Sequence, residues 1–254
     1  MKAKELSSGN GTTVTTAEQM KEGPSPAEQL DSLIGLQGVK EEVKRLTNFI
    51  RIQKQRDEAG LKTAGISYHC VFTGNPGTGK TTVARIVAGL YNELGILKKG
   101  HLVETDRSGL VAEYMGQTAV KTNKIIDSAL DGVLFIDEAY ALISPDASND
   151  YGSEAVDTLV KMMEDHRDDL VVIVAGYTEE MKHFLRSNTG LISRFNKFIS
   201  VAGYSRQQLL DMLNVRAGKS GMSGADSSVK KPDLRLAAMD GQGLKDFGNA
   251  RGVR

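Results

Sequence analysis

The hydrophobic positions of this chain switch repeatedly between two spacings over residues 30–202. Short apolar runs alternate with longer stretches whose apolar residues recur every three or four positions, as on one face of a helix. Five segments have the length and composition of strands: "YHCVFT", "HLVETD", "VLFID", "LVVIVAG" and "KFISV". Because "VLFI" and "LVVIVA" are apolar throughout, both faces of these strands should be covered by helices. The pattern predicts an α/β fold with a parallel five-stranded sheet flanked by helices.

Helical periodicity predicts the elements around these strands. The segment "SPAE", residues 25–28, combines a cap residue, a proline and a glutamate three positions after the cap, so a short helix should begin there. A second, amphipathic helix should run from Val39 to near Gly60. Three further helices are predicted, over residues 83–94, 120–130 and 156–163. After the last strand, Ser205 and Gln208 form a capping box that predicts another helix.

These elements divide the chain into three parts. Residues 1–24 are rich in Ser, Thr, Gly, Lys and Glu without periodicity, so we expect a flexible leader with no function of its own. Residues 25–202 form the α/β domain. Residues 203–254 contain helical segments on either side of a loop rich in Gly and Ser, which predicts a small, partial helical domain.

Composition narrows the class of protein. The chain has 254 residues, 40% of them hydrophobic, and its 32 basic and 32 acidic side chains cancel, which argues against nucleic acid as a partner. The one cysteine, Cys70, lies in an apolar run and predicts a buried thiol in a reducing compartment. The four histidines lack the spacing of a zinc site. Without a signal peptide or an apolar run of about 20 residues, we expect a cytoplasmic protein with no membrane segment.

The loop "GNPGTGKTT", residues 74–82, lies between a predicted strand and a predicted helix. It fits G-x-x-x-x-G-K-[ST] through Gly74, Gly79, Lys80 and Thr81. Glycines let the backbone curl so that its N–H groups face phosphate oxygens, and the following helix adds its positive N-terminal end. Lys80 would contact the β- and γ-phosphates, and the Thr81 hydroxyl would bind Mg²⁺. The alternative, a glycine-rich turn with an incidental Lys-Thr pair, is disfavoured by the flanking strand and helix.

Two carboxylates follow the buried strand in "VLFIDEAY". Asp137 and Glu138 would be costly at the end of such a strand unless a cation or a bound water met them. In an NTPase, Asp137 would hold Mg²⁺ through a water ligand and Glu138 would orient the attacking water. Taken alone, the pair could equally cap the next helix; the phosphate loop upstream favours the NTPase interpretation.

Two arginines are further candidates. Arg194, in "GLISRFNKFI", precedes the last strand, and an arginine can neutralise a phosphoryl group in a neighbouring subunit's site. Arg251, in "GNARGVR", could reach a nucleotide held between two domains. An ordinary solvated surface charge remains the alternative for each of them.

Seven segments, in this order, carry a resemblance: "LIGLQGVKEEV", "GNPGTGKTTVARIVAGLY", "EYMGQTAVKT", "VLFIDEAYAL", "VVIVAGYTEEM", "GLISRF" and "FGNARGVR". Together they resemble the AAA+ ATPases of the CbbX and SpoVK group, which includes red-type Rubisco activase and EccA-type secretion proteins. The resemblance covers about residues 29–254. It implies a P-loop NTPase with a helical lid that binds ATP and Mg²⁺, forms a homo-oligomeric, typically hexameric ring and remodels a protein client. Rubisco is one such client, in the cytoplasm or in an algal plastid stroma.

The resemblance also implies roles for single residues. Ile34 and Gly35 would pack the adenine. Asp137 and Glu138 would be the Walker B carboxylates. The phosphate loop would comprise Gly74, Asn75, Pro76, Gly77, Thr78, Gly79, Lys80, Thr81 and Thr82.

Further roles follow from the remaining segments. Thr178 would sense the γ-phosphate, with Tyr177 as the alternative. Arg194 would be the finger that reaches the neighbouring subunit, and Arg251 the sensor on the lid. The pore loop that grips the client would comprise Tyr114, Met115 and Gly116. An exposed loop tyrosine without this role is the alternative for Tyr114.

The C-terminal part departs from the family pattern. Residues 218–243 are rich in Gly and Ser, and the chain ends at Arg254, so we expect a C-terminally truncated lid that holds Arg251 with little packing. Two other functions compete with an ATP-driven motor that remodels a protein client. One is a nucleotide-controlled protein-binding module with negligible hydrolysis, and the other is a DNA-directed AAA+ protein, against which the neutral charge argues.

Overall fold

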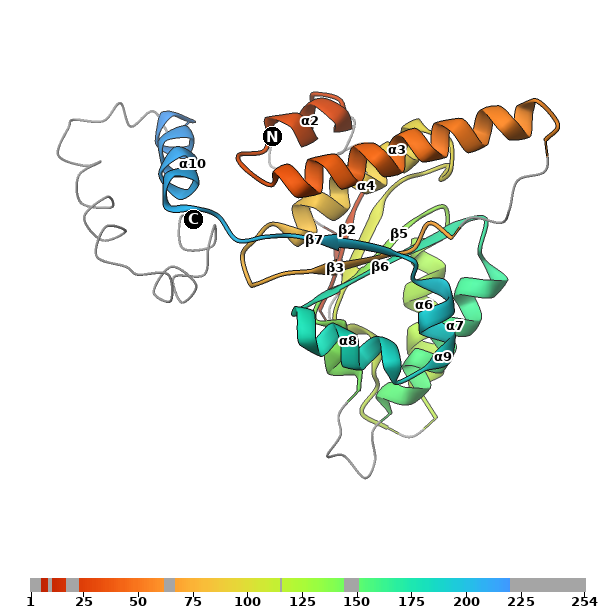
Figure 1. Ribbon diagram of the computed structural model, residues 1–254. Helices are drawn as coiled ribbons and strands as arrows, with labels where there is room; N and C mark the ends of the chain where they lie inside the picture. Colours follow the sequence, from red (N-terminus) through yellow and green to blue (C-terminus); the bar gives the residue numbers. More distant parts are fainter. Residues whose placement is uncertain are drawn as a thin grey trace.

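The computed structural model describes residues 6–8, 11–16, 23–61, 67–114, 116–143 and 151–219. One seven-stranded sheet, with the order β1-β2-β4-β5-β6-β3-β7, forms the centre of the molecule (Figure 1). The strands are β1 (Leu6–Ser8), β2 (Thr12–Thr15), β3 (Cys70–Thr73), β4 (Leu102–Thr105), β5 (Gly132–Ile136), β6 (Leu170–Gly176) and β7 (Lys197–Ser200). The last five of these are parallel to one another, which confirms the predicted α/β fold with a five-stranded parallel sheet.

Helices cover both faces of this sheet (Figure 1). One face carries α2 (Pro26–Ser32), α3 (Gln37–Glu58) and α4 (Lys80–Glu93). The other carries α5 (Arg107–Leu110), α6 (Thr118–Ala129), the 3₁₀ turn η1 (Ala139–Leu142), α7 (Gly152–Asp165), α8 (Thr178–Arg186) and α9 (Thr189–Arg194). Finally, α10 (Arg206–Lys219) follows β7.

Successive side chains of a strand point to opposite faces of the sheet, so the buried residues form two hydrophobic cores. Phe72 and Phe135 face α3 and α4, whereas their neighbours Val71 and Leu134 face α6 and α7. Each strand interior is therefore covered on both sides, and Cys70 is buried in the first core as predicted. In the described part of the chain, no helix combines the length and apolarity needed to cross a bilayer.

Local signals account for the helix starts. The Ser25 hydroxyl accepts a hydrogen bond from the Glu28 N–H, and the Glu28 carboxylate accepts one from the Ser25 N–H, so the predicted capping box of α2 is confirmed. The same reciprocal bonds join Ser205 and Gln208 before α10. Four short elements, α5, α8, α9 and η1, were not predicted, because with four to nine residues they have too few turns to show a period.

The predicted flexible leader is where the structure differs most. Residues Leu6–Ser8 and Thr12–Thr15 form an antiparallel hairpin that pairs with β4 and extends the sheet. The segment "TTVT" has the β-branched residues that favour strands, and Val14 packs against the second core. The Thr12 hydroxyl lies 3.2 Å from the Thr105 hydroxyl in a buried contact. Part of the leader therefore belongs to the sheet, and the two strands cover what would be its open edge.

The carboxyl ends of the parallel strands meet at one edge of the sheet. The chain leaves β3 for α4 and returns as β4, three strands away, with β6 and β5 between them. In open parallel sheets, ligands bind at such a crossing point, outside the carboxyl ends of the strands.

Candidate functional site

The loop after β3 curls as its glycines allow. Gly77 and Gly79 have φ values of 70° and 95°, in the left-handed region that favours glycine. A Cβ at Gly74 would overlap the carbonyl of Val201, which follows β7. The loop is also fixed from outside, because the Tyr204 hydroxyl donates a hydrogen bond to the Thr78 carbonyl at 2.9 Å.

Lys80 is the first residue of α4 and is buried, with 9% of its surface exposed. Its ammonium donates hydrogen bonds to the carbonyls of Gly74 and Asn75, both at 3.0 Å. The loop therefore wraps around a cation that α4 places at its own N-terminus, where the helix dipole also favours an anion.

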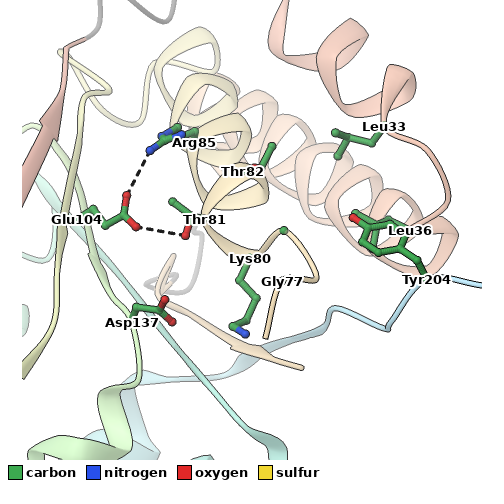
Figure 2. A pocket seen from close by; sticks show the side chains of 11 residues that line it. Leu33, Leu36, Gly77, Lys80, Thr81, Thr82, Arg85, Glu104, Asp137 and Tyr204 are labelled. Carbon is green, nitrogen blue, oxygen red and sulfur yellow. Dashed lines mark hydrogen bonds and ion pairs between the residues drawn. The ribbon is translucent and has the colours of Figure 1, made fainter. Parts of the chain in front are cut away.

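A cavity of about 290 Å³ opens beside this loop (Figure 2). It is lined by Leu33, Leu36, Gly77, Gly79, Lys80, Thr81, Thr82, Arg85, Glu104, Asp137 and Tyr204. Five of these residues belong to the predicted phosphate loop and the first turn of α4, and Asp137 joins them from the end of β5. The cavity thus has apolar side chains from the α2–α3 connection and both cations and carboxylates beside the loop.

Oxygen atoms suited to a divalent cation meet in this cavity. The Thr81 hydroxyl and the Asp137 carboxylate both line it, and Mg²⁺ prefers such hard oxygen ligands completed by water and phosphate. Within the described residues, no group of three or more His, Cys, Asp or Glu side chains is placed to hold a metal ion. The donor set fits a magnesium ion that arrives with a phosphate ligand.

Glu138 has an unusual backbone conformation, and its side chain lines a different cavity from Asp137. Its φ of 50° is left-handed, which is uncommon for a side chain of this size and is typical of functional positions. Its N–H donates to Asp137 Oδ1 at 3.0 Å. The exposed side chain lines a second cavity of about 590 Å³, together with Arg107 and Lys121, and is not among the described lining of the first.

The second cavity connects Glu138 to the loop that carries Tyr114. Arg107, in α5, donates to the carbonyls of Ala141 and Leu142, at 2.7 and 3.1 Å, and so binds the turn that follows Glu138. Tyr114 lies beyond α5 and is 67% exposed. Gly116, with φ of 75°, provides the turn before α6. Met115 and Arg251 lie outside the described residues.

The two candidate γ-phosphate sensors follow β6. Tyr177 is partly buried and its ring lies 5.7 Å from that of Tyr140. Burial and the negative charge of Glu138 raise the pKa of Tyr140 to about 12, so this ring stays protonated. Thr178 is exposed at the start of α8 and, like Tyr177, is not among the described residues that line the first cavity. The choice between them stays a prediction.

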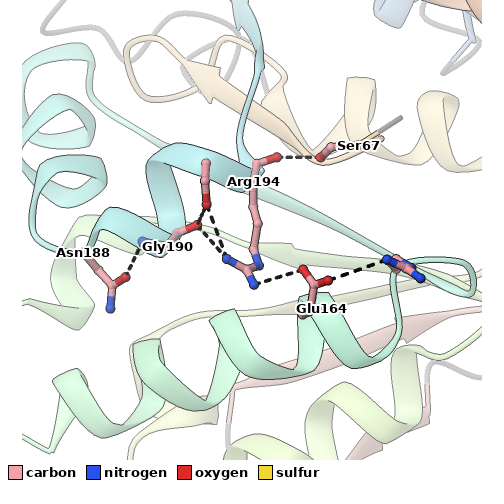
Figure 3. Close-up of polar contacts among 7 residues, drawn as sticks. Ser67, Glu164, Asn188, Gly190 and Arg194 are labelled. Carbon is pink, nitrogen blue, oxygen red and sulfur yellow. Dashed lines mark hydrogen bonds and ion pairs between the residues drawn. The ribbon is translucent and has the colours of Figure 1, made fainter. Parts of the chain in front are cut away.

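Arg194 ends α9 on the side of the sheet that α7 covers (Figures 1 and 3). Its Nη2 lies 3.1 Å from Glu164 Oε2, and its Nη1 donates to the Gly190 carbonyl at 3.2 Å. The side chain is 22% exposed and is not among the described residues lining either cavity. Within one chain, this arginine and the phosphate loop are therefore separate.

The apolar part of the cavity differs in detail from the prediction. Leu33 and Leu36 line it, whereas Ile34 is not among the described lining residues. Gly35 has φ of 66° and lies against the Gln208 side chain of α10, since a Cβ there would approach that amide to 2.7 Å.

Sequence reasoning missed five lining residues, Leu33, Leu36, Arg85, Glu104 and Tyr204. Arg85 lies four positions after Thr81 on one helix face, a spacing that could have indicated it. Glu104 is a charged residue near the end of an apolar strand, which is the signal that singled out Asp137.

Comparison with known proteins identifies the family of this chain. Residues 70–202 match the model of the ATPase family associated with various cellular activities (AAA). The chain belongs to the AAA family. This AAA protein is also similar in fold to the FIGL-1 AAA domain, whose crystal structure is a complex with ADP. The two share 17% sequence identity and a TM-score of 0.56, over 82% of this chain and 64% of that one.

Curated relatives of the AAA protein confirm the resemblance to the CbbX and SpoVK group. Protein CbbX of Cereibacter sphaeroides is 43% identical over 232 residues, which cover 89% of this chain and 73% of CbbX. Stage V sporulation protein K of Bacillus subtilis is 46% identical, over 72% of this chain and 57% of that protein. The ESX-3 secretion system protein EccA3 of Mycobacterium leprae is 48% identical over 74% of this chain, which spans only 30% of EccA3.

Proposed function

We propose that this AAA protein binds ATP with Mg²⁺ in the cavity beside the phosphate loop, hydrolyses it and uses the cycle to remodel a protein client. The observation that carries the proposal is the meeting of Lys80, Thr81 and Asp137 in one cavity at the crossing point of the sheet. A cation, a hydroxyl and a carboxylate from two separate segments match the needs of a triphosphate and its metal ion.

Each residue has a distinct task in binding. The N–H groups of the loop and the α4 N-terminus would hold the phosphates, and the Lys80 ammonium would move from its carbonyl partners to the phosphate oxygens. Thr81 and Asp137 would hold Mg²⁺, which neutralises phosphate charge when bound. Leu33, Leu36 and Tyr204 supply apolar surface for the base.

Hydrolysis requires an oriented water. Glu138 follows Asp137 directly and is the candidate to orient it, in agreement with the position of the paired carboxylates after β5. Its side chain lines the second cavity, so a rotation toward the phosphates would have to accompany nucleotide binding or assembly. Because the Glu138 side chain lines the second cavity and not the first, a second candidate function is also favoured: a nucleotide-controlled protein-binding module with negligible hydrolysis.

A ring of chains that acts on a protein is the wider proposal. Family membership and relatives such as the ribulose bisphosphate carboxylase/oxygenase activase of Cyanidioschyzon merolae, 46% identical over 178 residues, support it, and Rubisco is one client to test. In this proposal residues 25–202 bind nucleotide, residues 203–254 act as the lid, and Arg194 completes the neighbouring site. Tyr114, 67% exposed, is suited to contact a client, and we propose no nucleic acid partner.

Phosphate release across protein concentration separates the two candidate functions. We expect the parent chain to gain activity per chain as concentration rises, because a site completed in trans needs assembly. Glu138→Gln should keep ATP affinity within about twofold and lose turnover by about 10²-fold or more. Unchanged turnover in this variant would contradict the role of Glu138. Tight ATP binding by the parent with no phosphate release at any concentration would favour the binding module.

A further inference from the structure

Glu104 lines the cavity beside the phosphate loop and lies in β4, a strand that the proposed function does not use. It is the third residue of β4, between β2 and β5, and pairs with Thr13 on one side and Phe135 on the other. Because both neighbours fix the strand, the direction of this side chain is well defined. Its carboxylate lines the cavity with 28% of the side chain exposed.

Two residues of α4 contact this carboxylate (Figure 2). The Thr81 hydroxyl donates to Oε1 at 3.3 Å, and Arg85 Nη2 lies 3.3 Å from Oε2. The two oxygens therefore bind one neutral donor and one cation on the same helix face. A partly buried carboxylate beside phosphate groups would be unfavourable alone, and Arg85, which contacts one of its two oxygens, offsets part of its charge.

The contact with Thr81 has a consequence for metal binding. A hydroxyl has one hydrogen and two lone pairs, so a Thr81 hydroxyl that donates to Glu104 keeps both lone pairs for a cation. A hydrogen bond of this kind fixes the orientation of a metal ligand and raises its basicity. Glu104 also adds a second negative charge to a cavity that Asp137 already lines.

We infer that Glu104 is a positioning residue for the magnesium ion: it orients the Thr81 hydroxyl as a ligand and adds charge that favours the divalent cation. The inference rests on the proposed function, because Mg²⁺ would enter with the nucleotide. The competing explanation is structural: the Arg85–Glu104 pair would only hold α4 against β4.

The Mg²⁺ dependence of nucleotide affinity tests this role without measuring activity. The dissociation constant of a fluorescent ADP analogue is measured with EDTA and with excess Mg²⁺, and the ratio of the value in EDTA to the value in Mg²⁺ is compared between variants. We expect Glu104→Ala to lower this ratio by about tenfold, the range found when a partner of a metal ligand is removed. Glu104→Gln, which keeps an acceptor for Thr81 but loses the charge, should lower it less. Affinity in EDTA should be unchanged or higher, because a negative charge near the phosphates is lost.

Two further variants separate the explanations. Glu58→Gln, in α3 and outside the described cavity lining, makes the same charge change and should leave the ratio unchanged. Arg85→Gln breaks the ion pair but leaves the Thr81 contact, so the ratio should not fall. A ratio that falls equally in Arg85→Gln and Glu104→Gln, or that stays at the parent value in both Glu104 variants, would overturn the inference.

The same titrations distinguish failure of the inference from failure of the proposed function. If the parent binds the analogue and only the Glu104 variants behave unexpectedly, the positioning role is wrong and the nucleotide site stands. If the parent does not bind the analogue in either buffer, the proposed function is wrong and the role of Glu104 falls with it.

Discussion

His69 is a buried side chain whose protonation should affect stability. It is 4% exposed, and its Nδ1 accepts a hydrogen bond from the Val172 N–H at 2.9 Å. Burial, and secondarily the positive charge of Arg194, lower its pKa from 6.5 to about 4. The folded protein therefore keeps His69 neutral at pH values where the unfolded chain binds a proton.

This shift predicts a loss of stability in mild acid. Between pH 6.5 and about 4 the unfolded state binds more protons at His69, so stability should fall as the pH drops through this window. From the two pKa values we expect His69 to contribute a loss of about 2 kcal/mol between pH 7 and pH 5. Urea unfolding of the parent and of His69→Gln at both pH values measures it. The variant should lose less stability than the parent, and equal losses would contradict the assignment.

The residues of the site differ in how far the sequence identified them. Lys80, Thr81 and Asp137 occur in two short motifs whose chemistry is local, and all three line the cavity. Leu33 and Tyr204 enter the cavity through tertiary packing from segments about 170 positions apart in the chain, which no local pattern encodes.

At the scale of elements, the hairpin of β1 and β2 has a testable role. One side of β4 is hydrogen-bonded to β2, where Thr13 pairs with Glu104 and Val14 with Val103. Removing residues 1–16 would leave this side of β4 as an open edge.

Amide hydrogen exchange tests this pairing. In the chain lacking residues 1–16 we expect peptides that cover Leu102–Thr105 to exchange about tenfold faster or more. The reason is that β4 can then open locally without breaking backbone hydrogen bonds to β2. Peptides that cover β7, at the opposite edge, should be unchanged. Equal exchange of β4 in the two proteins would show that the hairpin does not protect the strand.

Strands and long helices were predictable because burial determines where their apolar residues lie: a strand covered on both faces is apolar throughout, and a helix covered on one face has apolar residues every three or four positions. β5 and β6 are buried at every position, and α3 buries Val39, Val43, Leu46 and Ile50 on one face. The hairpin was not predictable in the same way. β2 has four residues, three of them Thr. These β-branched residues favour a strand, but a run this short shows no period, and its pairing with β4 is a tertiary contact.

At the scale of the whole molecule, the proposed finger role of Arg194 depends on assembly. In one chain its guanidinium is paired with Glu164 and does not line the described nucleotide cavity. Action on a neighbouring site would require this pair to open or to lie at the contact between chains.

If Arg194 acts in the site of a neighbouring chain, its removal should affect ATP turnover but not nucleotide binding. Arg194→Ala should bind nucleotide within about twofold of the parent and lose phosphate release by about 10³-fold at concentrations where the parent is active. Arg167→Ala is the matched control, because Arg167 also pairs with Glu164, at 3.7 Å, and is exposed. Full activity of Arg194→Ala, or equal loss in both variants, would contradict the finger role.

The central claim is that the cavity beside residues 74–81 is a nucleotide site, and calorimetric titration with ATP and Mg²⁺ tests it most directly. The parent chain should bind one ATP per chain. Lys80→Ala should bind at least about a hundredfold more weakly, because the buried cation of the loop is lost. An unfolding midpoint within a few degrees of the parent would show that the variant is folded. Absence of binding by the parent, or equal affinity in folded Lys80→Ala, would contradict the account.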